Sequence, residues 1–156
     1  MQTVMECGQW TLRRRVLPQH TDHAGVMWHG AYLAWLEEAR VEALAGVGLA
    51  YGDLSARGLE LPVVGLTLQY LQPLRHGDVV DVVSRVLPRT GLKLTWHSRF
   101  VSAEEGLAAE ARVDLVLVDR HAQAMAAAGG GPVFRLRRRW PDDLAAAATA
   151  LAQGRG

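Results

Sequence analysis

The segment 31–45 is apolar around more of its circumference than a helix on a protein surface can be. Its apolar residues recur at steps of three and four, which predicts an α-helix that stops at Gly46. Leu33, Val41 and Leu44 widen the apolar stripe beyond one face. The stripe itself consists of Tyr32, Trp35, Leu36, Ala39 and Ala43. Such a helix has to be enclosed on most sides, and we expect a curved β-sheet to enclose it.

Alternating apolar and polar residues predict strands on both sides of this helix. One strand is expected before it and a short second helix directly after it. The predicted strands are 10–17, 63–71, 78–87, 92–101, 108–118 and 133–140, and the second helix is 50–58. The four long strands after the helices predict an antiparallel meander, with the helix packed on one of its faces. The fold class is therefore α+β.

The length of 156 residues predicts one domain, 1–156, with a core at about 10–140. A low-complexity connection at 122–131 and an alanine-rich tail helix at about 141–153 complete the chain. A single sheet of this kind leaves one face and its edges uncovered. We therefore expect a homodimer or homotetramer.

Composition excludes several classes of function. The chain has 17 basic and 16 acidic residues, a net charge of +1, which argues against nucleic-acid binding. The single cysteine, Cys7, cannot form an internal disulfide, and residues 1–20 do not resemble a secretory leader. No apolar run approaches the roughly 20 residues needed to span a bilayer. We expect a cytoplasmic protein that does not insert into membranes.

The loop 19–30 carries the residues most suited to chemistry. Three of the six histidines, His20, His23 and His29, lie there beside Asp22. No recognisable metal motif or second ligand cluster completes a site, so no metal is expected. Asp22 has an ordinary interpretation, a turn residue whose carboxylate accepts backbone N–H bonds. Because the free N–H groups of the following helix could polarise a carbonyl, Asp22 is also a candidate base or nucleophile.

Residues 20–40, HTDHAGVMWHGAYLAWLEEAR, resemble the DxxGxxxxxxY region of the 4-hydroxybenzoyl-CoA thioesterase family, in particular its YbgC-like acyl-CoA thioesterases. The similarity continues weakly through LPVVGLTLQYLQPLRHGDVVDV and VDLVLVDR. The matching positions in the first segment are Thr21, Asp22, Ala24, Gly25, Val26, His29, Tyr32, Glu38 and Arg40. The resemblance implies a hotdog fold, in which an antiparallel sheet wraps a long central helix, and a thioesterase that needs no cofactor.

The resemblance also implies roles for single residues. Asp22 would attack the thioester carbonyl or activate water, and the backbone N–H of His29 or Gly30 would polarise the carbonyl oxygen. The His29 side chain would assist proton transfer or position the substrate. Gly25 would allow a close approach of the backbone to the thioester. Trp28 would either line the acyl pocket or pack against its neighbours.

The substrate implied is an acyl-CoA, whose phosphates need cations or backbone N–H groups. Arg89 and Thr90, in the turn before 92–101, are the candidates, with Arg75 and the basic run 135–139 as rivals. Aromatic acyl groups, including dihydroxynaphthoyl, and aliphatic ones both remain open.

Two alternative functions have the same expected fold. One is a hotdog dehydratase or hydratase, but the proline that is typical of its loop is missing from DHAGVMWHG. The other is a non-catalytic acyl-CoA-binding module, which usually carries a DNA-binding segment that the region before Trp10 does not supply.

Overall fold

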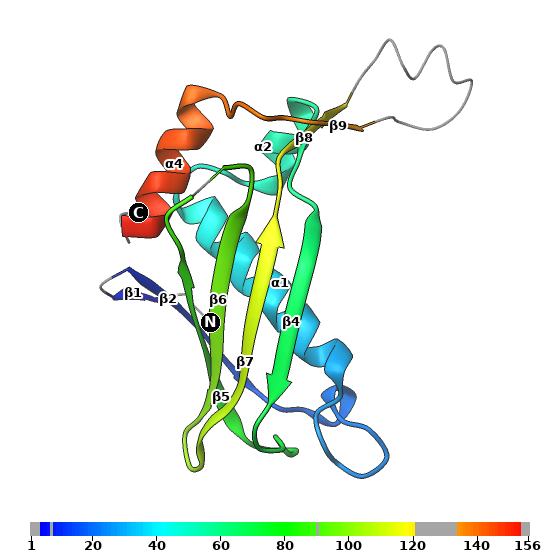
Figure 1. Cartoon of the computed structure of the whole chain (residues 1–156). Coiled ribbons are helices and arrows are strands. Elements are labelled where there is room, and N and C mark those ends of the chain that lie inside the picture. Colours follow the sequence, from blue (N-terminus) through cyan, green and yellow to red (C-terminus); the bar gives the residue numbers. More distant parts are fainter. Residues whose placement is uncertain (1–3, 7, 90, 121–133, 154–156) are drawn as a thin grey trace, which may run out of the picture.

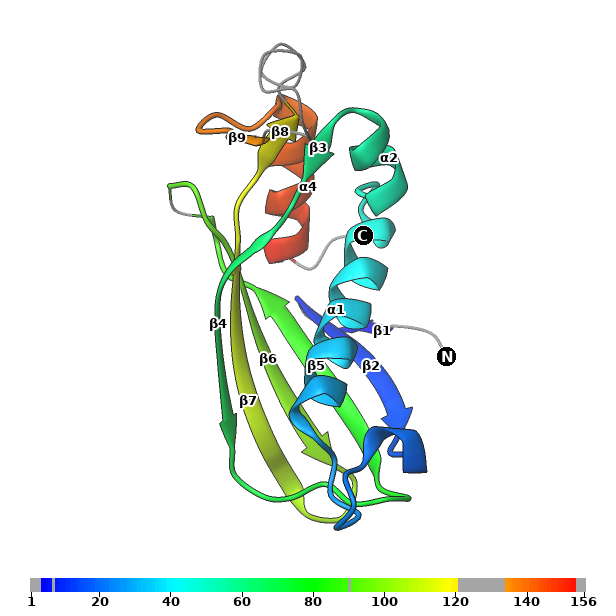
Figure 2. The same ribbon diagram turned by 90° about the vertical axis from the view of Figure 1, so that its right-hand side faces the viewer.

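The long helix predicted at 31–45 is present and forms the centre of the fold. In the computed structural model, which describes residues 4–6, 8–89, 91–120 and 134–153, this helix is α1 (His29–Gly46). A six-stranded antiparallel sheet curves around it, as the side view in Figure 2 shows. The buried residues of α1 are Ala31, Tyr32, Trp35, Leu36, Ala39, Arg40, Ala43 and Leu44. The predicted α+β hotdog architecture is confirmed.

The sheets and helices have the following bounds (Figure 1). The main sheet, in the order β1-β2-β5-β6-β7-β4, consists of β1 (Val4–Glu6), β2 (Gln9–Arg15), β5 (Val79–Val86), β6 (Leu94–Ser102), β7 (Gly106–Leu115) and β4 (Val63–Tyr70). A second sheet of three strands consists of β3 (Leu59–Glu60), β8 (Val118–Arg120) and β9 (Phe134–Leu136). The other helices are η1 (Pro18–His20), α2 (Tyr51–Ala56) and α4 (Asp142–Gln153).

Several predicted boundaries are corrected. Helix α1 begins at His29 and a 3₁₀ turn occupies 18–20, so the predicted loop 19–30 is shorter than expected. The predicted strand 108–118 is two strands, β7 and β8, because the chain leaves the main sheet where the Val116 N–H bonds to the Pro62 carbonyl. Only 134–136 of the predicted strand 133–140 is a strand, and it belongs to the second sheet. The connection 122–131 lies outside the described residues.

The predicted meander is wrong at β4, which pairs with β7 and not with β5. Consecutive strands usually pair, but here side-chain size favours the non-local partner. Leu68 lies opposite Ala111, and Tyr70 lies opposite Ala109, so large residues of β4 face small residues of β7. Strand β4 consequently forms one edge of the main sheet.

The inner face of the sheet packs against α1 through large apolar side chains. Phe100 and Trp96 on β6 are almost completely buried, and the Phe100 ring lies 5.0 Å from that of Tyr32 on α1 in an edge-to-face arrangement. One polar contact joins the same two layers, because Arg14 on β2 forms an ion pair with Glu38 on α1. The helix is thus fixed to the sheet by packing and by charge.

The edge strand β4 is exposed on both faces although its sequence is apolar. Val63, Val64, Leu66 and Tyr70 have exposed fractions between 43% and 53%. Its outer side has no neighbouring strand in the described part of the chain. An apolar edge of this kind is a surface on which a further strand can pair.

We predict that Phe100→Ala lowers the free energy of unfolding by about 3–5 kcal/mol, because it leaves a cavity beside Tyr32. Urea unfolding followed by circular dichroism measures this value. Val101→Ala, the next residue on the same strand but on the outer face, is the control and should cost less than about 1 kcal/mol. Equal losses in the two variants would contradict the assigned core.

Candidate active site

Asp22 sits in a tight turn just before α1. Its backbone N–H donates to the Val26 carbonyl over 2.8 Å, and its carbonyl accepts from the Gly25 N–H over 3.0 Å. Its carboxylate atom Oδ1 accepts the backbone N–H groups of Ala24 (2.9 Å) and Val26 (3.1 Å). The second oxygen, Oδ2, accepts no hydrogen bond from a described residue. The ordinary role predicted for Asp22 is therefore real, and it leaves one carboxylate oxygen available.

The environment of Asp22 keeps it ionised. The N–H group of Val26 lowers the pKa of the Asp22 carboxyl below its usual value, and the N–H group of Ala24 adds to this effect. Burial acts in the opposite direction but does not prevail. Because the side chain is exposed, solvent can reach the free oxygen. Asp22 is thus an accessible carboxylate in a fixed position.

Neighbouring backbone segments hold the turn in place. Thr21 and Met27 form an antiparallel bridge, and Val26 forms another with Arg75, in the connection between β4 and β5. The Met27 N–H donates to the Leu74 carbonyl over 2.7 Å. Met27 and Leu74 are both buried, so the base of the loop is anchored in the core while Asp22 remains at the surface.

The first turn of α1 offers unpaired backbone donors next to this turn. Trp28 is the N-cap, and neither its side chain nor an acidic residue in the first turn caps the helix. The first N–H groups of a helix have no partner within it, so those of His29 and Gly30 can donate hydrogen bonds to a ligand. Together they carry part of the positive end of the helix dipole. An oxygen that becomes negative can be stabilised there.

Trp28 and Gly30 depend on each other. The Trp28 indole is 45% exposed and packs edge-to-face on the His29 ring, with 5.1 Å between the centroids. It also covers Gly30, where a Cβ atom would lie 2.3 Å from the indole. A larger residue at position 30 would displace the indole, so glycine allows Trp28 to lie over the helix start.

A pocket of about 300 Å³ opens beside the loop, and we call it the loop pocket. It is lined by Val26, Met27, Tyr32, Tyr70, Leu71, Gln72 and Pro73. The rings of Tyr32 and Tyr70 meet edge-to-face at 5.2 Å. Burial, with a contribution from Tyr70, raises the pKa of Tyr32 to about 12, so its phenol is neutral at ordinary pH. The loop pocket is therefore mainly apolar and borders the end of β4.

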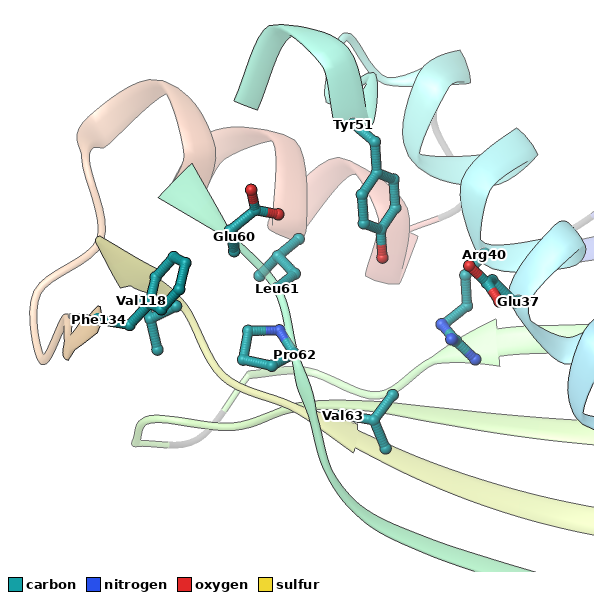
Figure 3. Close-up of a pocket in the computed structure, with 9 residues that line it drawn as sticks. All are labelled: Glu37, Arg40, Tyr51, Glu60, Leu61, Pro62, Val63, Val118 and Phe134. Carbon is teal, nitrogen blue, oxygen red and sulfur yellow. The ribbon is translucent and has the colours of Figure 1, made fainter. Parts of the chain in front are cut away.

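A larger pocket, of about 540 Å³, lies near the other end of β4 (Figure 3), and we call it the Arg40 pocket. Its lining residues are Glu37, Arg40, Tyr51, Glu60, Leu61, Pro62, Val63, Val118 and Phe134. Arg40 is only 8% exposed, and its Nε has no hydrogen-bond partner among the described residues. Figure 3 shows this side chain and the Tyr51 hydroxyl directed into the same space. A buried guanidinium without a partner is costly unless a ligand or another chain supplies one.

The residues expected to bind CoA lie far from Asp22 of the same chain. Arg89 belongs to the hairpin between β5 and β6, at the upper end of the sheet in Figure 1, whereas the loop before α1 lies at the lower end. Its guanidinium lies 4.7 Å from the centre of the Trp140 ring and donates to the Gly91 carbonyl over 3.1 Å. Thr90 lies outside the described residues. The structure thus brings together Asp22, Gly25, Trp28, His29 and Gly30 but not Arg89.

Sequence reasoning assigned no function to Arg40 or to the pocket around it. The sequence contained a signal, because Arg40 follows Ala39 within a helix that is otherwise apolar on most sides. That signal could not show whether the guanidinium reaches solvent, as long side chains at the margin of an apolar stripe often do. The arrangement of the surrounding elements shows that the Arg40 side chain is largely buried and lines a pocket.

Two kinds of feature are absent from the described residues, a cluster of metal ligands and a membrane-spanning helix. Among the described residues, no group of three or more His, Cys, Asp or Glu side chains is arranged to hold a metal ion. None of the helices in the described ranges is long and apolar enough to cross a membrane.

Comparison with known proteins identifies the family. Residues 16–148 match the model of the thioesterase-like superfamily, and the chain belongs to this superfamily. Within it, the chain is 33% identical over 105 residues to the acyl-CoA thioester hydrolase YbgC of Escherichia coli, which covers 67% of this chain and 78% of that protein. The YbgC-like membership predicted from residues 20–40 is confirmed.

Two further proteins are similar over large parts of the chain. A Synechocystis protein that carries the name esterase sll0410 is 40% identical over 106 residues, which is 67% of this chain and 64% of that protein. The crystal structure of the hypothetical protein TT1821 from Thermus thermophilus has 29% sequence identity and a TM-score of 0.71, and the match covers 92% of this chain and 97% of that one. The fold is therefore shared along nearly the whole chain.

We predict that Gly25→Ala lowers the free energy of unfolding by about 1–2 kcal/mol, because Gly25 has a φ of +77°. No atom lies within 4 Å of the added Cβ, so the loss comes from the backbone alone. Gly52→Ala, within α2 and equally unobstructed, is the control and should leave stability unchanged or raise it by up to about 1 kcal/mol. Thermal or urea unfolding of both variants tests the assignment, and a harmless Gly25→Ala would contradict it.

Proposed function

We propose that this protein hydrolyses an acyl-CoA thioester to a carboxylic acid and CoA. The observation that carries the proposal is the Asp22 carboxylate, which is held through Oδ1 and free at Oδ2, a few residues before an uncapped helix start. The relationship to acyl-CoA thioester hydrolase YbgC supports the same reaction. A carboxylate and an oxyanion-stabilising helix start are the two groups that thioester hydrolysis needs.

The reaction can proceed in two ways at this site. In the first, Oδ2 of Asp22 accepts a proton from water as the water oxygen attacks the thioester carbon. In the second, Oδ2 itself attacks, and water then hydrolyses the resulting anhydride. In both, the backbone N–H of His29 or Gly30 stabilises the oxyanion, the carbon–sulfur bond breaks, and CoA leaves as a thiolate that takes up a proton. The His29 imidazole, at the helix start, is a candidate to supply that proton or to orient the substrate.

The surroundings of Asp22 suit a thioester. Gly25, with its open left-handed turn, leaves room for the substrate to approach the backbone. The Trp28 indole, half-exposed over Gly30, offers an apolar surface at the mouth of the site. The loop pocket lies between Val26 and Met27 of this loop and the end of β4 at Tyr70, and its apolar lining suits either the acyl chain or the pantetheine arm.

We propose that the enzyme is a homodimer joined through the β4 edges. An antiparallel pair of β4 strands related by a two-fold axis near Leu66 would bring Val63 of one copy opposite Tyr70 of the other. Tyr70 borders the loop pocket and Val63 borders the Arg40 pocket. Each catalytic loop would then face the Arg40 pocket of the other copy, and the two chains would share each active site.

This pairing also suggests a role for the residues expected to bind CoA, which do not lie near Asp22 of the same chain. The connection between β5 and β6 that carries Arg89 lies beyond the Val63 end of the sheet, which is the end that would approach the catalytic loop of the second copy. We propose that Arg89 and Thr90 contribute to CoA binding in that way. We also place the enzyme in the cytoplasm, because a single cysteine suits a reducing compartment.

We predict that Asp22→Asn lowers kcat/KM for acyl-CoA hydrolysis by at least about 100-fold, because the amide is neither a base nor a nucleophile. The Asn oxygen can still accept the N–H groups of Ala24 and Val26, so the fold should persist. Release of free thiol from a panel of aromatic and aliphatic acyl-CoAs measures the effect. Asp53→Asn, an exposed acid on α2, is the control and should retain full activity.

The same panel separates the alternatives. Equal rates for Asp22→Asn and the unmodified protein would remove Asp22 from the mechanism. Formation of an enoyl product without free thiol would favour a dehydratase or hydratase. Tight acyl-CoA binding without turnover would favour a binding module.

We predict that Leu66→Lys converts the dimer into monomers, because it places like charges next to each other at the centre of the paired β4 edges. Sedimentation velocity measures the change, and thiol release should fall in parallel because each site needs both copies. Leu136→Lys, on β9 with a similar exposed fraction of 40%, is the control and should remain dimeric. A Leu66→Lys variant that stays dimeric would contradict the β4 interface.

A further inference from the structure

The outer face of the main sheet, opposite α1, contains a hollow that thioester hydrolysis does not use. Its volume is about 330 Å³, and we call it the outer hollow. It is lined by Gln9, Val83, Ser84, Arg85, His97 and Arg99, from strands β2, β5 and β6. Alternation along β6 places His97 and Arg99 on the outer face, because Trp96, Ser98 and Phe100 between them are buried.

Register brings the basic side chains of the outer hollow together. Arg85 on β5 lies directly opposite His97 on β6, and Arg99 lies two residues further along β6 on the same face. His97 in turn lies opposite Arg112 on β7. Arg99 lies opposite Val83 on β5, so Arg85 and Arg99 are diagonal neighbours on one face of the sheet, about 7–8 Å apart by the usual strand spacing. Two guanidinium groups at this spacing repel each other, and an anion between them offsets the repulsion.

Two other arginines on this face have acidic partners, whereas Arg15 donates only to the Gly77 carbonyl among the described residues. Arg13 forms a 2.8 Å ion pair with Asp81, and Arg112 lies 3.5 Å from Asp114. In contrast, Arg85 and Arg99 form no ion pair or hydrogen bond with any side chain that the structure describes. For Arg99 this holds even though Glu110 lies opposite it in the register.

The hollow offers hydrogen-bond donors and almost no free acceptor. The two guanidinium groups are donors only, and the His97 imidazole and the Gln9 amide each add donor capacity. The Ser84 hydroxyl is already used, since its oxygen lies 2.6 Å from that of Ser98 in the buried layer. A site with this donor set selects an anion.

We propose that the outer hollow binds a phosphate group of a ligand other than the acyl-CoA in the active site. Paired guanidinium groups match the oxygens of a phosphate, and the volume admits a phosphate with part of the molecule that carries it. The catalytic loop lies at the other side of the sheet, on the face that holds α1 (Figure 2). A second copy of the same face is an unsuitable occupant, because it would bring Arg85 and Arg99 against equal charges.

Calorimetric titration of the full-length protein with inorganic phosphate at low ionic strength tests the proposal. We expect saturable binding of one phosphate per chain, weakened about tenfold or more by Arg85→Gln and by Arg99→Gln. Arg15→Gln is the matched control, because Arg15 is also an exposed arginine on the outer side of β2 but lies outside the hollow. It should change the affinity less than about twofold.

Two further probes identify the source of the phosphate. Adenosine 3′,5′-bisphosphate represents a soluble phosphate ester, and vesicles of phosphatidylglycerol, compared with phosphatidylcholine, represent an anionic lipid headgroup. Binding of any phosphate probe that depends on Arg85 and Arg99 supports the proposal, and the probe that binds most tightly names the source. Absence of saturable binding for every probe, or equal weakening by Arg15→Gln, would overturn it. Thiol release by the Arg85→Gln and Arg99→Gln variants should remain unchanged, which separates this site from the proposed activity.

Discussion

Burial of α1 in the concave face of the sheet is the interaction on which the rest of the molecule depends. Phe100 and Tyr32 pack together at the point where the helix leaves the catalytic loop. Packing fixes the helix start, and the bridge between Val26 and Arg75 joins the loop to the connection between β4 and β5. The position of Asp22 relative to the first N–H groups of α1 is therefore set by the core. Apolar burial supplies the rigidity of this region.

The helix leaves one edge of the sheet without cover, and the two apolar pockets both lie along that edge. The loop pocket borders the Tyr70 end of β4, and the Arg40 pocket borders the Val63 end. Within one chain, Tyr32 of the loop pocket and Arg40 of the Arg40 pocket are eight residues apart on α1, about 12 Å along the helix axis. A two-fold pairing of β4 removes this separation, because it reverses the direction of the second strand. The same pairing that protects an exposed edge would therefore complete the active site.

Local patterns in the sequence predicted most of this fold, and failures occurred where a distant segment decides the outcome. Apolar residues cover most of the circumference of the segment 31–45, and this local pattern was sufficient to predict a helix enclosed by other elements. The pairing of β4 was not accessible in this way, since it depends on the match of Tyr70 and Leu68 with alanines some forty residues later. The Asp22 turn was predicted for the same reason as the helix, since its hydrogen bonds join residues at most four apart. The Arg40 pocket was missed because six elements that are separate in the sequence, α1, α2, β3, β4, β8 and β9, form it.

The two interpretations of Asp22, a turn residue and a reactive carboxylate, describe one arrangement. Hydrogen bonds from Val26 and Ala24 fix the carboxylate, and they also lower its pKa. A lower pKa makes a carboxylate a weaker base and a weaker nucleophile. These hydrogen bonds therefore fix the Asp22 carboxylate and keep it ionised, and they also make it less basic. The mechanism that we propose would therefore rely more on stabilising the oxyanion at the helix start, which is the contribution that usually dominates in acyl transfer.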